Sequence, residues 1–519
     1  MSTQKSPLGW EYTLIKDIAE LHRGVSYKKI DASKTEKKGY LPVLRANNIN
    51  DEINFNDLVY VPEKNIKSEQ LIREGDIIIA MSSGSKHLVG KAAQAKNDFK
   101  AGFGVFCGLI RPSDVIDKKY IGYFFYSSNY RQIIRKFSSG ININNLRRTH
   151  IEELAISVPP LTEQRRIVTK IEELFTRLDA GIKSLKNAQA QLKRYRQSVL
   201  KAAVEGRLTA EWRERRLTAS PCSAQAGEYE FEPADKLLER ILKERHEKWE
   251  AELLAKYKSK GKKPPKNWQD KYKEPTPPDT TNLPELPNSW EWSFIDQISY
   301  EIRYGSSSRT NTDKIGIPIL RMGNIIDGNL VFNKLKYLPE NHYEFPDLFL
   351  ISGDLLFNRT NSPELVGKTA IYEGFHSPCS FASYLIRVRF CEGIEPHFIS
   401  FFINSSYGRA WIRSVVSQQV GQANVNGTKL KNLTVPLPPL YEQIIITKEI
   451  DRIFSICREI EAPLESEIKR AQSLRQSILK RAFEGKLVPQ DPNDLSASVL
   501  LERIKAEKAK NKKAKQTEI

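Results

Sequence analysis

The chain contains two copies of one arrangement, and this internal repeat restricts its fold more than any other feature. The segment RQSVLKAAVEGRL at 196–208 returns as RQSILKRAFEGKL at 475–487. Upstream of these, PPLTEQ at 159–164 returns as PPLYEQ at 438–443. In each copy the two segments read as the ends of one long helix that stops at a Gly. The repeat therefore predicts a unit of similar structure used twice in one chain.

The region before each PPL segment reads as a globular domain. Short apolar runs bounded by Gly, Asn or Ser, such as 76–79, are typical of strands, and the apolar spacing at 120–137 is helical. Framework segments recur, since LPVLRANNI at 41–49 matches IPILRMGNI at 317–325. We therefore expect an α/β or α+β domain in each copy. The aromatic residues expected in the two cores are Trp10, Tyr12, Trp290 and Trp292.

The helix that follows each domain carries a seven-residue apolar repeat. A sustained repeat of this length predicts a coiled-coil seam, and we expect the two seams to pack on each other. Pro463 predicts a kink or a restart of the second helix. The seam positions are Ile171, Leu178, Leu185, Leu192 and Val199, with Leu174, Gly181, Ala188, Tyr195 and Ala202 between them, and Ile450, Cys457, Leu464, Ala471 and Ile478, with Ile453, Ile460 and Leu474 between them.

Two charged segments flank the second copy. In the first of them Leu237, Leu238 and Ile241 form an apolar stripe, which we expect to dock a partner protein. The basic segment 502–515 is expected to be a frayed, solvated helix. The expected parts are a first domain at 1–158, a first spacer helix at 159–208, a charged helix and Pro-rich linker at 209–288, a second domain at 289–437, a second spacer helix at 438–488 and a charged tail at 489–519.

Composition narrows the class of partner and the cellular compartment. The net charge of +18 favours a polyanionic partner, with DNA or RNA as the first candidate. The five cysteines are scattered without a CxxC pair, which argues against a zinc site or a disulfide framework and fits a reducing cytoplasm. The N-terminus lacks a secretory signal pattern, and no apolar run approaches the ~18 residues of a membrane span. We therefore expect a soluble, cytoplasmic protein.

The sequence lacks the motifs of enzymes that act on DNA. SPELVGKT at 362–369 approaches a phosphate-binding loop, but Ser362 stands where that loop needs Gly, and the parallel segment has Ala92 in place of the Mg²⁺-binding hydroxyl. No Pro-Pro pair has the neighbours of an amino-methyltransferase motif, and the seven His residues form no HExxH pair. We expect no catalytic residue, no metal site and no cofactor in this chain.

The order of these parts resembles a known family. A variable domain, PPLxEQ, a long helix, RQSxLKxAxEGxL, and then all of it again is similar to the specificity subunit of type I restriction–modification systems, over essentially the whole chain. The resemblance implies two target-recognition domains, two long antiparallel helical spacers and an asymmetric bipartite DNA target with an unread gap. It also implies a non-catalytic subunit that assembles with modification subunits, two of them expected, and with restriction subunits. S-adenosylmethionine, ATP and Mg²⁺ would then be bound by those partners.

Two other classes of function remain open on the sequence. An independent nuclease or ATPase with degenerate motifs would need a catalytic cluster that the sequence does not show. A coiled-coil scaffold without a nucleic-acid role would leave the net charge of +18 and the two diverged domains unexplained.

Candidate DNA-binding residues are chosen by their chemistry, because members of the resembled family differ most in these domains. Base edges are read by Arg, Lys, Asn, Gln or Ser side chains on exposed loops. Arg45 and Arg321 occupy matching strand ends, and the sequence allows either of two roles for them, a structural salt bridge or a contact with a DNA phosphate. Part of the 142–148 loop matches 424–426, so it reads equally well as a structural turn. The DNA-binding candidates are Lys28, Lys29, Ser82, Ser83, Ser85, Lys86, His87, Asn142, Asn144, Arg147 and Arg148 in the first domain, and Arg303, Tyr304, Ser307, Arg309, Arg359, Asn361, Gln418, Gln419, Gln422 and Asn424 in the second.

The repeated helix-end motifs and the apolar stripe are the candidate surfaces for partner subunits, because both copies retain the helices while the domains diverge. The partner-binding candidates are Glu163, Gln164, Arg196, Gln197, Glu205 and Gly206 in the first copy, Glu442, Gln443, Arg475, Gln476, Glu484 and Gly485 in the second, and Leu237, Leu238 and Ile241 between the copies.

Overall fold

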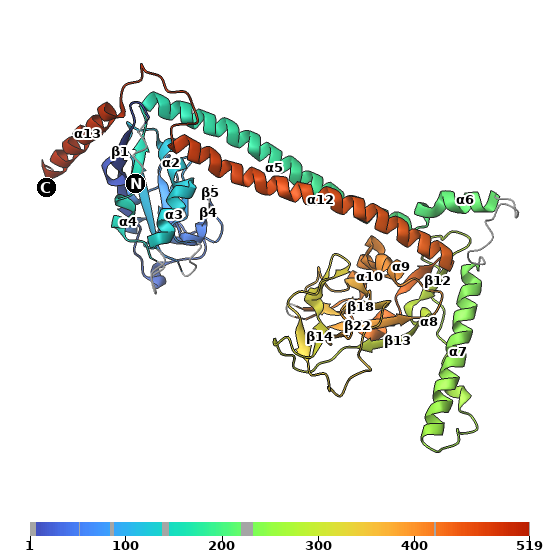
Figure 1. Cartoon of the computed structure of the whole chain (residues 1–519). Helices are drawn as coiled ribbons and strands as arrows, with labels where there is room; N and C mark the ends of the chain where they lie inside the picture. The colour runs from blue at the N-terminus through green and yellow to red at the C-terminus, as the bar shows by residue number, and fades with distance from the viewer. Residues whose placement is uncertain are drawn as a thin grey trace. The chain divides into compact units, whose positions relative to one another are not determined.

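The computed structural model of the chain describes residues 7–50, 52–83, 88–137, 145–218, 232–419 and 422–517. The chain divides into two compact units. Unit 1 comprises Met1–Asn187 and Leu464–Ile519, and unit 2 comprises Ala188–Pro463. Each unit therefore combines one globular domain with part of each of the two longest helices, which are drawn in teal and orange-red in Figure 1.

The domain of unit 1 is built on a four-stranded antiparallel sheet. Its strand order is β2 (Ala19–Arg23), β10 (Cys107–Pro112), β7 (Ile77–Ala80) and β8 (Ala92–Gln94). Because alternate side chains of a strand point to opposite faces, Ile77 and Ile79 belong to one apolar core and Ile78 to another. The first core includes side chains of the helices α2 (Lys118–Tyr126) and α3 (Ser128–Phe137). The four residues of β7 are all buried, which explains its uninterrupted apolar sequence.

Smaller elements complete this domain. The second core lies against the sheet β6 (Val59–Pro62), β3 (Tyr40–Leu44) and β9 (Gly102–Phe103), in which β3 and β9 run parallel. The strand β1 (Glu11–Leu14) pairs with β11 (Ala155–Val158), so the first and last strands of the domain lie together where the long helix begins. Short elements are α1 (Ile15–Ile18), β4 (Ile49–Asn50), β5 (Glu52–Ile53) and α4 (Arg148–Glu152).

The domain of unit 2 repeats this plan. Its main sheet has the order β13 (Ser299–Tyr304), β22 (Leu385–Phe390), β18 (Asp354–Asn358) and β20 (Thr369–Tyr372). The helices α9 (Pro396–Asn404) and α10 (Ser406–Val415) contribute to the core on one face of that sheet. The other elements are α8 (Ile295–Ile298), the pair β12 (Glu291–Phe294) and β25 (Thr434–Leu437), the sheet β17 (Lys336–Leu338), β14 (Ile317–Leu320) and β21 (Ser380–Phe381), and β15 (Ile325–Ile326), β16 (Asn329–Leu330) and α11 (Gly427–Lys431).

These two domains confirm the predicted α/β fold in two copies. Trp10 and Trp290 are buried in their cores as expected. Tyr12 is exposed, however, and Trp292 is only half-buried, so the expectation of a core position is wrong for both. They occupy the second positions of β1 and β12, next to Glu11 and Glu291, which are also exposed.

The long helices α5 (Leu161–Val204) and α12 (Leu440–Phe483) pack together antiparallel, as expected (Figure 1). In unit 1, Ile171 near the start of α5 shares a core with Ile478 near the end of α12, and Asp179 pairs with Arg475. In unit 2, Val199 near the end of α5 shares a core with Ile450 near the start of α12. A further ion pair there joins Arg196 Nη1 and Glu461 Oε1 at 2.9 Å.

Parts of the predicted seam are corrected by the structure. Tyr195, Ile460 and Leu474 are 51%, 48% and 48% exposed, because two helices alone cover only a narrow strip of each other. The helix α12 continues through Pro463 without an interruption, so the predicted restart is wrong.

Two shorter helices pack on the domains rather than on partners. In unit 2, α7 (Ala234–Ser259) buries Leu237 and Ile241 completely in the core of the second domain. In unit 1, α13 (Ala497–Thr517) buries Leu500 and Ile504 in the core of the first domain. The repeated LLERI segment thus packs a helix on a domain in both units, and the expected partner stripe is wrong. Within 502–515, Ile504 packs on the domain, whereas most of the other side chains that the structure describes are exposed, as expected of a solvated helix. The helix α6 (Ala210–Thr218) follows α5.

The helices within the described parts of the chain include none long and apolar enough to span a membrane.

Candidate nucleic-acid interface

A strand junction in the first domain brings the two predicted DNA-binding loops together. Ser82, just after β7, forms a backbone bridge with Asn145, and the Leu146 N–H donates to the Met81 carbonyl at 2.7 Å. The segments 81–83 and 145–148 therefore lie side by side, although more than sixty residues separate them in sequence. Arg147 and Arg148 are exposed at this junction, and Arg148 pairs with Glu152 at 2.7 Å.

The second domain contains the same junction at matching positions. The Val425 N–H donates to the Arg359 carbonyl at 2.9 Å, as Leu146 does to Met81. Here the contact grows into a small sheet of β19 (Thr360–Asn361), β24 (Gln422–Asn424) and β23 (Ser417–Gln419). Within it, the Asn424 Nδ2 donates to the Thr360 Oγ1 at 3.1 Å. The junction is thus a shared framework that displays different side chains in the two domains.

An aromatic contact supports the arginine at the second junction. The Arg359 guanidinium carbon lies 4.8 Å from the centre of the Tyr304 ring. The Tyr304 hydroxyl in turn accepts a hydrogen bond from the Gly427 N–H at 2.7 Å. A Cβ atom at residue 427 would lie 3.0 Å from that hydroxyl, so Gly keeps the contact free of crowding. Tyr304 and Arg359, predicted from separate loops, therefore form one unit at the junction.

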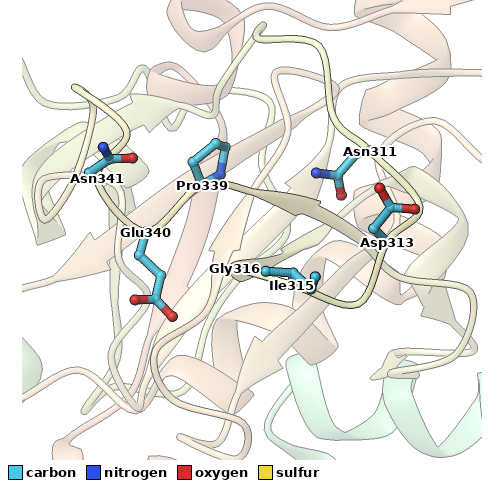
Figure 2. A pocket seen from close by; sticks show the side chains of 7 residues that line it. All are labelled: Asn311, Asp313, Ile315, Gly316, Pro339, Glu340 and Asn341. Carbon is cyan, nitrogen blue, oxygen red and sulfur yellow. The ribbon is translucent and has the colours of Figure 1, made fainter.

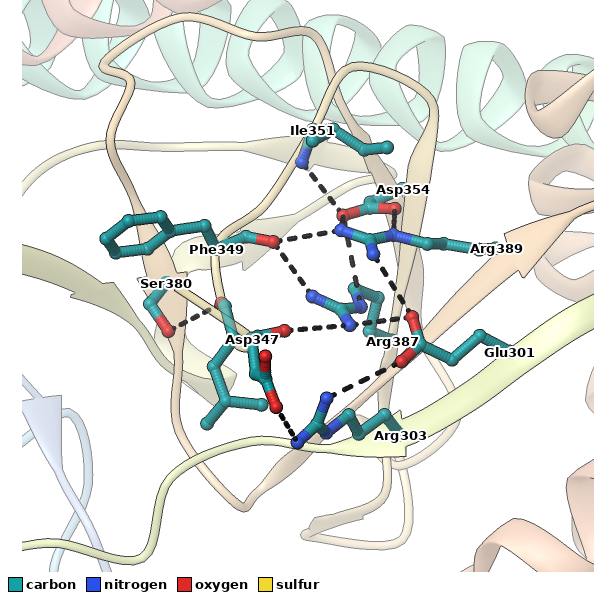
Figure 3. Close-up of polar contacts among 10 residues, drawn as sticks. Glu301, Arg303, Asp347, Phe349, Ile351, Asp354, Ser380, Arg387 and Arg389 are labelled. Carbon is teal, nitrogen blue, oxygen red and sulfur yellow. Dashed lines mark hydrogen bonds and ion pairs between the residues drawn. The ribbon is translucent and has the colours of Figure 1, made fainter. Parts of the chain in front are cut away.

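Arg303, one of the predicted DNA-binding residues, lies among carboxylates. It pairs with Asp347 at 3.1 Å and with Glu301 at 3.7 Å, inside the network of ion pairs shown in Figure 3. At the centre of that network the fully buried Arg387 donates to Glu301 at 2.7 Å, and burial lowers the pKa of its guanidinium. Arg303 therefore forms ion pairs within its own domain, while its side chain stays partly exposed.

The network also contains a pair that both domains retain. Arg389 Nε lies 2.8 Å from Asp354 (Figure 3). At the matching place in the first domain, Arg111 Nη2 lies 2.7 Å from Asp76. Burial raises the pKa of the Asp354 carboxyl, although the bond from Arg389 opposes this effect. A buried aspartate with a bonded arginine joins the two central strands in each domain, which makes the pair a structural element.

Other predicted DNA-binding residues lie on a loop that leaves the first strand of each main sheet. Lys28 and Lys29 are exposed after β2, and Ser307 and Arg309 are exposed after β13. Each loop begins at a Gly that passes directly over the neighbouring backbone; a Cβ at Gly24 would lie 2.1 Å from the Gly104 carbonyl oxygen. These loops belong to the same place in the two domains.

The remaining candidates divide into described and undescribed residues. Asn361 uses its side-chain oxygen to accept from the Ser362 N–H at 2.8 Å, and Ser83 lies next to the junction. Of the two matched arginines, Arg45 forms an ion pair with Asp57 at 2.8 Å, which is the structural role that the sequence allowed as one of two alternatives. Outside the described residues lie Ser85, Lys86, His87, Asn142 and Asn144, together with the side chains of Gln418, Gln419 and Gln422.

The Glu-Gln pairs of the PPL segments attach each domain to the start of its helix. The Trp10 indole N–H donates to Glu163 at 3.0 Å, and the Trp290 indole N–H donates to Glu442 at 2.9 Å. Gln164 accepts from the Asp117 N–H at 3.0 Å, just before α2. Gln443 similarly accepts from the Glu395 N–H at 2.8 Å, just before α9. All four Glu and Gln side chains are buried in their own unit, so the expectation that they contact a partner is wrong.

The RQSxLKxAxEGxL motif likewise serves the fold of this chain. Glu205 accepts from the Tyr407 hydroxyl at 2.6 Å, and Gln476 donates to the Tyr126 carbonyl at 3.2 Å. Gly206 and Gly485 end the helices with φ of 71° and 67°, the left-handed conformation that favours Gly. Arg196 and Arg475 hold the two helices together through the ion pairs already described. Gln197 is exposed and Glu484 is half-buried at this motif.

One basic cluster escaped the prediction from sequence. Lys314, Lys334 and Lys336 lie around Arg321 in the second domain. The signal was present in the repeat, because Lys334 replaces Asp57, the residue that neutralises the matching arginine in the first domain. Among the described residues, no group of three His, Cys, Asp or Glu side chains could hold a metal ion.

The comparison with protein families decides what the two domains belong to. A family model described as the type I restriction modification DNA specificity domain matches residues 7–193 and again residues 287–470. The chain belongs to the family of type I restriction–modification specificity subunits. The two matches of the family model coincide with the two copies found in the sequence, each with the start of its long helix.

This specificity subunit is similar to relatives over nearly their whole length. The specificity subunit of the type I restriction enzyme EcoKI of Escherichia coli (strain K12) is 33% identical, over 98% of this chain and 97% of that protein. That of StySPI of Salmonella potsdam is 32% identical, over 98% and 97%. A chain from a structural study of assembly and conformational transition in a type I system has the same fold, with a TM-score of 0.61 at 17% identity, covering 93% of this chain and 100% of that chain.

This protein is therefore a DNA specificity subunit, the non-catalytic component of a type I restriction–modification system, and it forms part of a larger complex.

Proposed function

We propose that this specificity subunit reads an asymmetric, bipartite double-stranded DNA target, with one half-site for each domain. The observation that carries the proposal is the strand junction, which recurs at matching positions with different side chains. At the first junction Arg147 and Arg148 are exposed, and at the second Arg359 stacks on Tyr304 beside Asn424. Arg and Asn are the residues that bind guanine and adenine edges most specifically. A shared framework with different polar residues suits two readers of different sequences.

The two long helices are proposed to set the unread gap between the half-sites. Each is 44 residues long, or about 66 Å at ~1.5 Å per residue. Their packing on each other makes both stiffer than a single helix, and each begins at a Trp–Glu contact that attaches it to a domain. The half-site spacing would then follow from helix length, as it follows from reader separation in other DNA-binding proteins.

The partners proposed for this subunit are two modification subunits and the restriction subunits. In this proposal the chain holds no cofactor, and S-adenosylmethionine, ATP and Mg²⁺ are bound by those partners in the cytoplasm. The surface proposed for a modification subunit is the exposed face of α12 in unit 2, where Ile456 and Ile460 lie one turn apart and are 44% and 48% exposed. Exposed isoleucines one turn apart on a charged helix favour a protein contact over solvent.

Methylome sequencing of the host tests this function. The expected result is one methylated motif with two specified parts and a fixed unread gap, which disappears when the gene for this chain is deleted. A deletion strain with an unchanged set of methylated motifs, or a motif without a gap, would contradict the proposal. The purified chain alone should transfer no methyl group from S-adenosylmethionine, and adding the modification subunits should start the transfer.

A further inference from the structure

The strands β3 and β14 end in the same loop in both domains. Arg45 and Arg321 follow these strands, and the backbone N–H of each donates to the side chain of an Asn three residues on, at 2.9 Å in both domains. That Asn, Asn48 or Asn324, is buried and donates to two backbone carbonyls across the loop. The same hydrogen-bonded loop thus positions the arginine in both domains, and only the residues around the arginine differ.

In the first domain a carboxylate closes the arginine site. The Arg45 Nη2 lies 2.8 Å from Asp57 Oδ2 and 2.6 Å from the Asp57 carbonyl oxygen. Asn47 donates to the same carboxylate at 3.3 Å. Asp57 has a φ of 51°, and the matching residue of the second domain has a φ of 50°. The backbone therefore presents the side chain at this position in the same way in both domains.

In the second domain that position is Lys334, so the charge facing the arginine is reversed. Gly323 also replaces Asn47. The Nε of Arg321, like that of Arg45, is buried without a hydrogen-bond partner among the residues that the structure describes, so the difference between the two sites is the carboxylate of Asp57 on the Arg45 Nη2. A partly buried guanidinium that faces an ammonium group instead of a carboxylate attracts an anion, because burial removes part of the water that would otherwise solvate its charge.

A cavity of about 560 Å³ opens beside this arginine. It is lined by four basic side chains and no carboxylate, and Thr312, Asn333 and Tyr337 add polar groups. The neighbouring cavity of about 530 Å³, shown in Figure 2, has the opposite character, because Asp313 and Glu340 lie on its walls. The residues that line the basic cavity are Thr312, Lys314, Arg321, Phe332, Asn333, Lys334, Leu335, Lys336 and Tyr337.

We propose that this cavity binds one phosphate of the DNA backbone next to the half-site of the second domain, through Arg321 and Lys334, with Lys314 and Lys336 beside them. The inference rests on the proposed DNA-reading function. A guanidinium with ammonium groups around it suits a phosphate oxygen cluster. The first domain lacks this contact because Asp57 occupies the place of the phosphate. The second domain therefore binds its half-site with more salt-sensitive affinity than the first.

Reciprocal substitutions at one position test the proposal in the complex purified through the full-length subunit. Lys334→Asp places the carboxylate of the first domain against Arg321 and closes the site. Asp57→Lys opens the site around Arg45. Both residues suit the left-handed backbone that the other domain already shows, so both variants should fold. The control is Lys256→Asp, which makes the same change of charge at an exposed position of α7.

The measurement is affinity for a duplex carrying the methylated motif, over a series of salt concentrations. Lys334→Asp should weaken binding about tenfold near physiological salt and reduce the slope of log K against log salt by about 0.9, the loss of one phosphate contact. Asp57→Lys should increase that slope by a similar amount. The methylated motif should be unchanged in both variants, because a phosphate contact carries no base identity.

Three results would overturn the proposal. In the first, Lys334→Asp binds DNA as Lys256→Asp does. In the second, the variant methylates a different base sequence, which would make the site a base reader. In the third, DNA binding is unchanged while inorganic phosphate raises the melting temperature of the wild type but not of Lys334→Asp, which would make the site one for a small free anion. Failure of the proposed function is separate, since it appears in the wild type as the absence of a bipartite motif.

Discussion

At the scale of single residues, two matching buried glutamates attach the domains to their helices with unequal support. Glu442 accepts from the Trp290 indole, from the Thr209 hydroxyl at 2.6 Å and from Arg213. Glu163 accepts from the Trp10 indole only, and its second oxygen is buried without a partner among the described residues. Burial raises the pKa of the Glu163 carboxyl, so its charged form is the less well solvated one.

This difference predicts unequal costs for the same substitution. Glu442→Gln leaves the partly buried Arg213 without its carboxylate and should destabilise unit 2 by about 3 kcal/mol. Glu163→Gln keeps an oxygen for Trp10 and loses a charge that forms no ion pair among the described residues, so it should cost less than about 1 kcal/mol. Hydrogen exchange at the starts of α12 and α5 measures the two effects separately. Equal loss of protection at both helix starts would show that the extra partners of Glu442 contribute nothing.

His397, at the start of α9, predicts how the stability of unit 2 depends on pH. Its ring nitrogens lie 2.9 Å from Glu395 and 2.6 Å from Glu373. The bond to Glu395, with the help of Glu373, raises the pKa of His397 to about 9. Because the folded-state pKa is the higher one, the ion pairs stabilise fully below the ordinary pKa of about 6.5 and are lost as the pH rises through about 9.

The variant His397→Gln should therefore be less stable than the wild type at pH 6, by ~1–2 kcal/mol after allowance for solvent screening. The difference should vanish near pH 10. Urea unfolding of both proteins across this range gives the comparison, and a difference that stays constant with pH would exclude the ion pairs as its cause.

At the scale of elements, the sequence predicted those helices and sheets whose pattern is local. The seven-residue repeat and the Gly stops located α5 and α12, since both signals depend on neighbours within one helix. The same reasoning misplaced α7. An apolar stripe such as Leu237 and Ile241 shows that one face of the helix is buried, but it does not show which surface buries that face. The buried Glu-Gln pairs were misread for the same reason, since their Trp and backbone partners lie far away in sequence.

At the candidate site the limit of sequence reasoning was similar. Chemistry selected Tyr304 and Arg359 from two separate loops, and the structure stacks one on the other. The same chemistry selected Arg303, but nothing in the local sequence shows that Asp347 and Glu301 pair with it. Which side chain pairs with which depends on strand register, and that register is a property of the folded sheet.

The exposed face of α12 predicts where assembly can be blocked. Ile460→Asp places a charge on the proposed contact for a modification subunit, and it should reduce recovery of that subunit with the tagged chain at least tenfold. Glu459→Lys changes charge at the neighbouring exposed position and serves as the control. Thermal melting should be close to wild type in both variants, because residue 460 is half exposed in the chain alone. If the modification subunit co-purifies normally with the Ile460→Asp variant, the contact does not lie on this face of α12.

The length of the paired helices predicts the gap in the target. Four residues inserted after Asn187 in α5, with four inserted after Pro463 in α12, should lengthen both helices by ~6 Å while adding about 1.1 turns to each. One base pair rises ~3.4 Å, so the methylated motif should keep both halves and widen its gap by about one or two base pairs. Methylome sequencing reads the gap directly. Retained methylation with the original gap would mean that the helices do not set it.

At the scale of the whole molecule, the two repeated units are not two consecutive stretches of chain, because unit 1 is formed by both ends of the sequence and unit 2 by its middle. Each unit joins the start of one long helix to the end of the other and adds one of the two LLERI helices. The Ala234 N–H donates to the Ser289 carbonyl in unit 2, and the Ala497 N–H donates to the Gly9 carbonyl in unit 1, so the C-terminal helix closes on the N-terminal domain. A domain exchanged between relatives must therefore carry its own LLERI helix with it.

Such an exchange tests the central claim, that each domain reads one half of the target. Residues 1–158 and 489–519 are replaced together by the matching segments of a relative with a known motif, and the methylome of cells with the chimera is sequenced. The matched exchange replaces 209–437, which contains the second domain and α7. The account predicts that the first chimera changes one half of the motif, the second chimera changes the other half, and the gap stays the same. A chimera that changes both halves, or an active one that changes neither, would contradict it.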